Sequence, residues 1–337
     1  MTDTSILSRD LVTIVIVNYE TSPFVARCVE SLKSQQQPHE IKIVDNPSPA
    51  DDWKNLPTEG VQVIRNSDNV GYGMACNEGA GEASEDSQFI CILNPDTAIP
   101  PGLLEKWVEA YKAVAPEGGI AAPALLNDNG MVQKSSYQFT TFWTYWANHS
   151  VFAGFMKGLR KGSLIRDTWK APVDNAAADI AVQQFNHAGG SPREMDWLMG
   201  AALLMDRTTW QLLQGFSPRY FLYAEDADLC WRCHEASLPV VYYPALAIIH
   251  SQGDPTPESR DKSMVRLFDG LMRFVHYNYG PLQRQGVRMA VILDMIARMS
   301  LFTVMRVVRP ADKLSAPRVR GAWKVLKNWL VFRPSED

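Results

Sequence analysis

The sequence predicts an α/β protein with a mostly parallel, Rossmann-like sheet, followed by a helical extension at the carboxyl end. Short apolar runs alternate with helix-length segments up to about Gly118, which is typical of a parallel sheet with crossover helices. The run Phe89–Leu93 is apolar at every position and therefore suits a strand buried on both faces. The strand is expected to end at Asn94-Pro95-Asp96, because proline cannot donate a hydrogen bond to a central ladder.

The first half of the chain supplies the strands and helices of this predicted sheet. The expected strands are Leu11–Val17, Ile41–Val44, Val61–Ile64 and Gln88–Leu93. The expected helices run from Thr21 or Ser22 to about Gln36, from the turn Gly71-Tyr72-Gly73 to about Ala83, and over Leu103–Val114.

Beyond Gly118 the pattern changes. An Asn-Gly pair at 129–130 between Ile120–Leu126 and Met131–Tyr137 predicts a β-hairpin. Residues 156–194 show no period and are expected to form a mobile loop over the site or an insertion. The expected elements after them are the strand Ala202–Met205, a helix starting at Glu225, and short strands at Leu238–Tyr243 and Leu246–Ile249.

Composition and charge exclude several classes of protein. With 46% hydrophobic and 21% charged residues, the chain has the composition of a soluble globular protein, and its net charge of −4 argues against a general nucleic-acid binder. The amino end has no basic region followed by an apolar core, so we expect no secretory signal and a cytoplasmic location. Cys230 and Cys233 lack the second cysteine pair of a zinc site and are expected to be two thiols on one helix.

Polar residues follow each expected strand of the first half. They are Asn18-Tyr19, Asp45-Asn46, residues 66–71 and Asn94–Asp96. Because open α/β sheets bind ligands at the carboxyl ends of their parallel strands, we expect these residues to gather at one edge and form a site.

Six segments resemble, in order, motifs of the family-2 inverting glycosyltransferases, and within them the rhamnosyltransferase branch. The segments are IVIVNYE (14–20), VDNPS (44–48), RNSDNVGYGMACNEG (65–79), ILNPDT (92–97), MDWLMGAALLMDR (195–207) and GFSPRYFLYAEDADLCWR (215–232). The resemblance covers about Val12 to Gly253 and implies the GT-A fold. One such match would be weak evidence, whereas six in the same order are strong evidence.

The resemblance also implies roles for individual residues. It implies that Asp45 reads a uracil or thymine base and that Asp96 and His250 bind a metal ion. Asn94 stands where many relatives carry aspartate, which leaves one charged metal ligand. The residues expected to contact substrates are Asn18, Tyr19, Asp45, Asn69, Gly71, Tyr72, Asn77, Asn94, Trp197, Gly200 and Arg232.

Each of these roles has a structural alternative. Asp45 and the glycines can be ordinary turn residues, and a lone histidine such as His250 is more often structural than a ligand. Arg232 can support the helix that carries the acidic pair.

The chemistry of glycosyl transfer explains why such residues are needed. A leaving nucleoside diphosphate is neutralised by Mg²⁺ or Mn²⁺, hard cations that prefer oxygen ligands such as Asp96. The attacking acceptor hydroxyl requires a base, and a carboxylate fixed at a helix start suits that role. We expect Asp226 to be this base and Glu225 to be the second candidate.

The carboxyl end differs from the rest of the chain, so we expect residues 1–280 to form the catalytic domain and residues 281–337 a basic amphipathic helical region. The nucleotide-sugar half of the catalytic domain would cover about 10–118 and the acceptor half about 119–280. Residues 281–333 contain 11 Lys/Arg and two Asp. Charges inside Met289–Val308 favour an amphipathic helix on an anionic membrane surface over a spanning helix. Packing on the catalytic domain or a homo-oligomer contact is the alternative.

The expected function is transfer of L-rhamnose from dTDP-β-L-rhamnose to a glycan or polyprenyl-diphosphate-linked acceptor in bacterial cell-surface polysaccharide synthesis. The alternatives are another UDP- or dTDP-sugar as donor, or a catalytically silent nucleotide-sugar-binding subunit. A nucleotidyltransferase would need a glycine-rich, basic loop after the first strand, and NYETSPF (18–24) provides neither feature.

Overall fold

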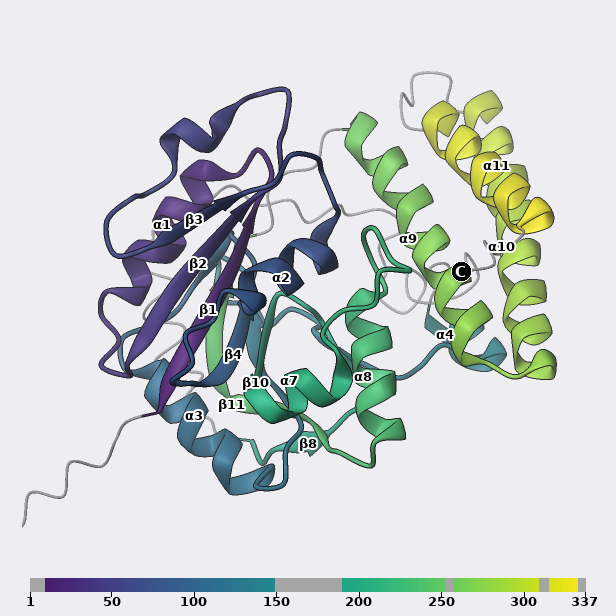
Figure 1. Ribbon diagram of the computed structural model, residues 1–337. Helices are drawn as coiled ribbons and strands as arrows, with labels where there is room; N and C mark the ends of the chain where they lie inside the picture. The colour runs from purple at the N-terminus through teal and green to yellow at the C-terminus, as the bar shows by residue number, and fades with distance from the viewer. Residues whose placement is uncertain (1–9, 149–189, 252–256, 309–314, 333–337) are drawn as a thin grey trace, which may run out of the picture. The chain divides into compact units, whose positions relative to one another are not determined.

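The computed structural model describes residues 10–148, 190–251, 257–308 and 315–332 (Figure 1). Its chain divides into two compact units. Unit 1 comprises residues 1–137, 172–221 and 225–253, and unit 2 comprises residues 138–171, 222–224 and 254–337. The domain boundary expected at residue 280 falls inside unit 2, between helices α9 (Pro257–Asn278) and α10 (Pro281–Val308).

Unit 1 is built on a mixed sheet. Among the described residues its strands lie in the order β3-β2-β1-β4-β10-β6-β11-β5, with β8 paired to β11. The strands are β1 (Leu11–Asn18), β2 (His39–Asp45), β3 (Gln62–Arg65), β4 (Ser87–Leu93), β5 (Thr97–Ala98), β6 (Ile120–Leu126), β8 (Arg193–Glu194), β10 (Ala202–Asp206) and β11 (Val240–His250). Neighbours from β3 to β4 are parallel, as are β6 and β11, whereas β10 runs antiparallel to both β4 and β6. The predicted mostly parallel α/β sheet is therefore confirmed.

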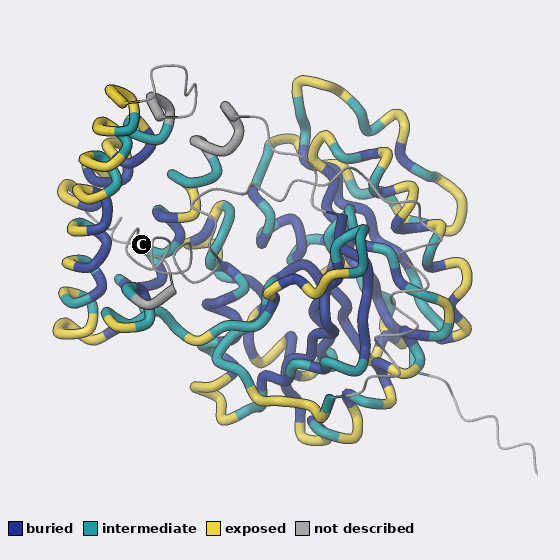
Figure 2. Tube along the Cα trace, turned by 180° about the vertical axis from the view of Figure 1, so that it is seen from behind, coloured by how far each residue is buried: buried dark blue, intermediate teal, exposed yellow. Residues whose placement is uncertain are grey.

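Helices cover both faces of this sheet. Alternate residues of β1 enter two separate cores, because successive side chains of a strand point to opposite faces. Ile14 and Ile16 pack with helices α1 (Ser22–Leu32) and α3 (Leu103–Val114), while Val15 and Val17 pack with helices α2 (Tyr72–Gly81), α7 (Arg207–Leu213) and α8 (Glu225–Glu235). Figure 2 shows the strands buried along most of their length.

Two predictions about the second half differ in part from the structure. The Asn129-Gly130 turn forms, and the returning chain pairs with the end of β6 over a short stretch, where Leu126 bridges Val132 antiparallel and the N–H of Gln133 donates to the Leu125 carbonyl. Strand β7 (Ser136–Tyr137) instead pairs with β9 (Trp197–Leu198), so no long hairpin exists. The two short strands expected at 238–249 are one strand, β11, with a register shift between Tyr243 and Ala247.

Two further predictions concern Cys230 and Cys233 and the segment 156–194. Cys230 and Cys233 are free, buried thiols on α8, as expected. The loop or insertion expected at 156–194 lies mostly outside the described residues.

Unit 2 contains α4 (Phe142–Asn148), α9, α10 and α11 (Ser315–Val331). Asp294 on α10 is completely buried and accepts hydrogen bonds from Tyr145 Oη at 2.8 Å and Arg298 Nε at 2.7 Å. The charges of α10 therefore include a buried aspartate that binds Tyr145 of α4 and pairs with the partly exposed Arg298 of α10. Within the described part of the chain, no helix is long and apolar enough to cross a membrane.

Candidate functional site

The ends of β1, β2 and β3 bring polar side chains together. Asn18 and Asp45 are register partners, and Asn18 Nδ2 donates to Asp45 Oδ1 at 2.7 Å. The backbone N–H of Asn66 donates to the carbonyl oxygen of Asp45, and Asn66 Nδ2 donates to the side chain of Asn46. Three of the predicted polar clusters thus meet at one edge of the sheet, whereas Tyr19 is 44% exposed beside them.

The Asp45 side chain is buried, and Arg65 neutralises its negative charge only in part. Arg65 Nε lies 3.7 Å from its Oδ2, and the Arg65 guanidinium sits 3.7 Å over the ring of Trp53. Burial raises the pKa of Asp45, while Asn18 and Arg65 act in the opposite direction. The Asp45 carboxyl group can therefore accept a hydrogen bond from a ligand N–H at this edge.

In the loop before α2, predicted site residues make hydrogen bonds that stabilise the loop. Asn69 Oδ1 accepts from the backbone N–H of Gly71, and Asn46 Nδ2 donates to the Gly71 carbonyl. Gly71 has a φ of +85°, and a Cβ there would lie 2.3 Å from the carbonyl oxygen of Phe221. Packing against Phe221 therefore requires this glycine independently of any ligand.

At the end of β4, Asp96 lies beside His250. Strand β5 follows Asp96 at once and pairs antiparallel with the end of β11, so that Thr97 faces His250. As a result Asp96 Oδ1 is 3.3 Å from His250 Nε2, and Asn94 Nδ2 is 3.4 Å from the same nitrogen. The Asp96 side chain remains 20% exposed.

These side chains fit part of a divalent-cation site. A carboxylate and an imidazole converge here. Carboxylate oxygens bind Mg²⁺ and Mn²⁺, and an imidazole nitrogen binds transition-metal ions. Within the described residues no group of three or more His, Cys, Asp or Glu side chains is placed to hold a metal ion. Asp96 and His250 would therefore supply two ligands of such a site, and further oxygen ligands would complete it.

The acidic pair begins α8, as expected. Asp226 Oδ2 accepts from the backbone N–H of Gly200 at 2.8 Å, and its Oδ1 accepts from that of Ala227 at 2.8 Å. Burial raises the pKa of Asp226, and these N–H groups oppose that shift. Glu225 is 5% exposed, and burial, followed by the nearby charge of Asp226, raises its pKa to about 8.

A two-residue segment connects the acidic pair to the end of β4. The N–H of Gly200 binds Asp226, and the carbonyl oxygen of the next residue, Ala201, accepts from the N–H of Asn94 at 2.8 Å. The end of β4 and the start of α8 are therefore held on either side of residues 200–201.

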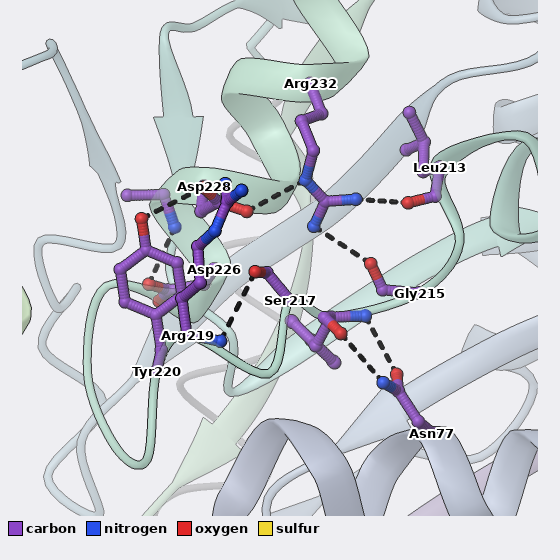
Figure 3. Close-up of polar contacts among 11 residues, drawn as sticks. Asn77, Leu213, Gly215, Ser217, Arg219, Tyr220, Asp226, Asp228 and Arg232 are labelled. Atoms are coloured by element: carbon purple, nitrogen blue, oxygen red, sulfur yellow. Dashed lines mark hydrogen bonds and ion pairs between the residues drawn. The ribbon is translucent and has the colours of Figure 1, made fainter. Parts of the chain in front are cut away.

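Other predicted substrate residues have structural partners (Figure 3). Arg232 donates to Asp228 and to the carbonyl oxygens of Leu213 and Gly215, which supports the loop before α8. Asn77 makes two 2.8 Å hydrogen bonds with the main chain of Phe216. These contacts account for Arg232 and Asn77 through packing, and a contact of either residue with a substrate stays a prediction.

Two aromatic residues among the predicted substrate contacts also have internal contacts. Tyr72 Oη donates to the Gly200 carbonyl at 3.1 Å. Trp197 stacks on Tyr137, with ring centroids 4.3 Å apart.

One residue of the site was not predicted from the sequence. Gln133 is 8% exposed, and its Oε1 lies 2.8 Å from His250 Nδ1. No motif marks Gln133, and it is separated from His250 by 117 positions in the chain. Only the tertiary structure brings the two residues together.

Comparisons with known proteins agree with the fold and the motifs. The family model described as Glycosyl transferase family 2 matches residues 13–165. An N-acetylglucosaminyl-diphospho-decaprenol L-rhamnosyltransferase from Mycobacterium tuberculosis is 26% identical over 261 residues, which cover 73% of this chain and 78% of that protein. The rhamnosyltransferase WbbL of Escherichia coli K12 is 22% identical over 250 residues, covering 71% of this chain and 83% of that protein.

A solved structure has a similar fold. The crystal structure of GalNAc-T7 with UDP, GalNAc and Mn²⁺ matches with a TM-score of 0.50 and 15% identity, covering 79% of this chain and 51% of that one. This chain thus spans about half the length of that protein. The family match over residues 13–165, the similar relatives and the fold agree with the expected family-2 glycosyltransferase.

Proposed function

We propose that the protein transfers L-rhamnose from dTDP-β-L-rhamnose to a lipid-linked glycan acceptor, with inversion, in the synthesis of a bacterial cell-surface polysaccharide. The main support for this proposal is the hydrogen bonding of residues 200–201. Gly200 binds Asp226 of the acidic pair, and Ala201 binds Asn94 at the end of β4, close in sequence to the proposed metal ligand Asp96. A single-displacement transfer needs a group for the leaving diphosphate and a base for the acceptor, and it needs no carboxylate nucleophile.

The donor would lie along the edge formed by the ends of β1, β2 and β4. Asp45 would accept a hydrogen bond from the imide N–H of thymine. Asp96 and His250 would hold Mg²⁺ or Mn²⁺, which when bound neutralises charge on the leaving diphosphate. Mn²⁺ in the GalNAc-T7 structure and the rhamnosyltransferase names of the curated relatives support this choice of cofactor and donor.

The acceptor would approach the start of α8. Asp226 would take the proton of the attacking hydroxyl, because two backbone N–H groups fix its carboxylate and burial raises its pKa toward the range of a useful base. The decaprenol-diphosphate-linked substrate named for the mycobacterial relative supports a lipid-linked acceptor.

A panel of nucleotide sugars tests the donor. We expect dTDP-rhamnose with Mg²⁺ to raise the melting temperature more than any UDP-hexose and to release dTDP when a lipid-linked N-acetylglucosamine acceptor is added. Stabilisation by a UDP-hexose alone would contradict the donor. Stabilisation without release of any nucleotide would indicate a catalytically silent binding subunit.

A lipid-linked acceptor also gives a role to the exposed apolar side chains of α10. They are Met289, Leu293, Ile296, Leu301, Val304, Val307 and Val308. Several recur at helical spacing along one stripe, as in a helix that lies in a membrane interface. Basic residues of the same carboxyl-terminal region, including Lys324 and Lys327 on α11, would favour anionic lipids. We therefore place this enzyme at the inner face of the cytoplasmic membrane.

Vesicle binding tests this placement. Changing Lys324 and Lys327 to Gln should weaken binding to anionic vesicles by about 1 kcal/mol for each residue, since each basic residue near such a surface contributes about that much. Lys106→Gln on α3 is the control. Binding that is the same for all forms, together with a concentration-dependent dimer lost in Leu293→Ser/Ile296→Ser, would favour a homo-oligomer contact instead.

A further inference from the structure

Gln133 makes two hydrogen bonds with His250 and a third with Asn127. Its Nε2 donates to the carbonyl oxygen of His250 at 2.6 Å and to Asn127 Oδ1 at 2.7 Å. A carbonyl oxygen can only accept, so the nitrogen of this amide must face it and Oε1 must face the imidazole. The 2.8 Å contact between Oε1 and His250 Nδ1 is therefore donated by the imidazole, which requires a proton on Nδ1.

The other ring nitrogen, Nε2, faces one hydrogen-bond acceptor and one hydrogen-bond donor. Asp96 Oδ1, at 3.3 Å from Nε2, is an acceptor and favours a proton there. Asn94 Nδ2, at 3.4 Å, is a donor and favours a lone pair. A neutral imidazole carries one proton only, so the hydrogen bond made by one nitrogen decides the state of the other.

We infer that Gln133 is a positioning residue that keeps the proton of His250 on Nδ1 and so presents the Nε2 lone pair to a divalent cation shared with Asp96. Without the Gln133 amide, the neutral ring would keep its proton on Nε2 and donate it to Asp96. Its lone pair would then lie on Nδ1, on the side away from Asp96. This inference rests on the proposed metal site and assigns to Gln133 a role outside the motifs described above.

The first test reads the tautomer in the metal-free protein. Nitrogen chemical shifts of ¹⁵N-labelled histidine, measured at about pH 8 where an unperturbed histidine is neutral, should show His250 protonated on Nδ1. In Gln133→Leu the proton should move to Nε2. Gln133→Glu keeps an acceptor for the Nδ1 proton and should retain the tautomer of the original protein.

The second test measures Mn²⁺ binding by calorimetry in the presence of dTDP. Groups that orient a metal-binding histidine typically contribute 10- to 100-fold in metal affinity, so Gln133→Leu should weaken Mn²⁺ binding by about that factor. Gln133→Glu should bind closer to the original protein than to Gln133→Leu. Gln35→Leu is the matched control, because Gln35 is also 8% exposed and its amide bonds only main-chain groups and Ser34.

The outcomes separate this inference from the proposed function. A proton on Nε2 in the original protein, or equal Mn²⁺ affinity in the original protein and Gln133→Leu, would overturn the inference and leave the proposed function standing. No Mn²⁺ binding by the original protein would overturn the metal site and the inference together.

Discussion

The two carboxylates proposed for the reaction, Asp96 and Asp226, are held in different ways. Asp96 follows a buried strand, and within the described residues its side chain has one polar partner, His250 at 3.3 Å, so oxygen lone pairs remain open there. Asp226 starts a helix, and each of its oxygens accepts a backbone N–H at 2.8 Å. A metal ligand needs free lone pairs, whereas a base needs a fixed position, and the two environments match these requirements.

Glu225, next to Asp226 at the start of α8, lies in a different environment from Asp226. It is more buried than Asp226, and its Oε2 has no hydrogen-bond partner among the described residues. Burial and the nearby charge of Asp226 raise the pKa of Glu225 and favour its neutral form. A neutral Glu225 beside Asp226 avoids placing two negative charges together, so Asp226 can carry the single charge of the pair.

The largest effect is expected for Asp96→Ala. Loss of the one charged ligand of the proposed metal site should lower turnover by several powers of ten and abolish Mn²⁺ binding in the presence of dTDP. Steady-state kinetics and calorimetry measure the two effects. Asp86→Ala, an exposed change just before β4, is the control. Full activity of Asp96→Ala in excess chelator would show that the reaction requires no metal ion.

Asp226→Asn should have the next largest effect. The amide keeps the size of the side chain but cannot take a proton, and general-base catalysis typically contributes about 10² to 10⁴ in rate. Turnover should fall by that factor, while the dissociation constant for dTDP-rhamnose should stay the same. A loss of donor affinity instead would move Asp226 to the donor side and make Glu225 the better candidate for the base.

Gly200→Ala tests whether the fixed position of Asp226 matters. An added Cβ would lie 3.2 Å from the Asp226 Cβ and displace the carboxylate by a few tenths of an ångström. Because a 1 Å misplacement can cost about 10²-fold, we expect a loss of turnover of up to about tenfold with unchanged Mn²⁺ binding. Gly81→Ala at the end of α2 is the control, since open space surrounds that position. Unchanged turnover in Gly200→Ala would show that the base tolerates displacement.

Glu225→Gln should have the smallest effect on turnover but a clear effect on stability. Glu225 has an ordinary pKa of 4.5 in the unfolded chain and about 8 in the folded protein. Between these values the folded state binds the extra proton, so the free energy of unfolding falls as pH rises, by at most about 1.4 kcal/mol per pH unit. Glu225→Gln should make this slope shallower in urea unfolding between pH 5 and about pH 8, and Glu235→Gln, exposed on the same helix, should leave it unchanged. A slope as steep in Glu225→Gln as in the original protein would place its source in other groups.

Much of the fold could be predicted from local patterns. The strands of the parallel half, helix α3, the start of α8 and the position of Asp96 follow from apolar runs, from proline and from acidic residues, because each of these signals acts over a few neighbouring residues. The contact of Asn18 with Asp45 follows as well, since parallel neighbours end at the same edge.

Tertiary structure alone decided which polar residues serve the site and which serve the fold. The amide of Asn77 looks like a ligand-binding group in the sequence but bonds the main chain of Phe216, 139 residues away. Gln133 shows no signal in the sequence, yet it sets the hydrogen bonding of His250 from 117 residues away. Local sequence fixes where a side chain leaves its strand or helix. The partner that it meets depends on the packing of distant segments, because hydrogen bonds form between groups that are close in space, whatever their separation along the chain.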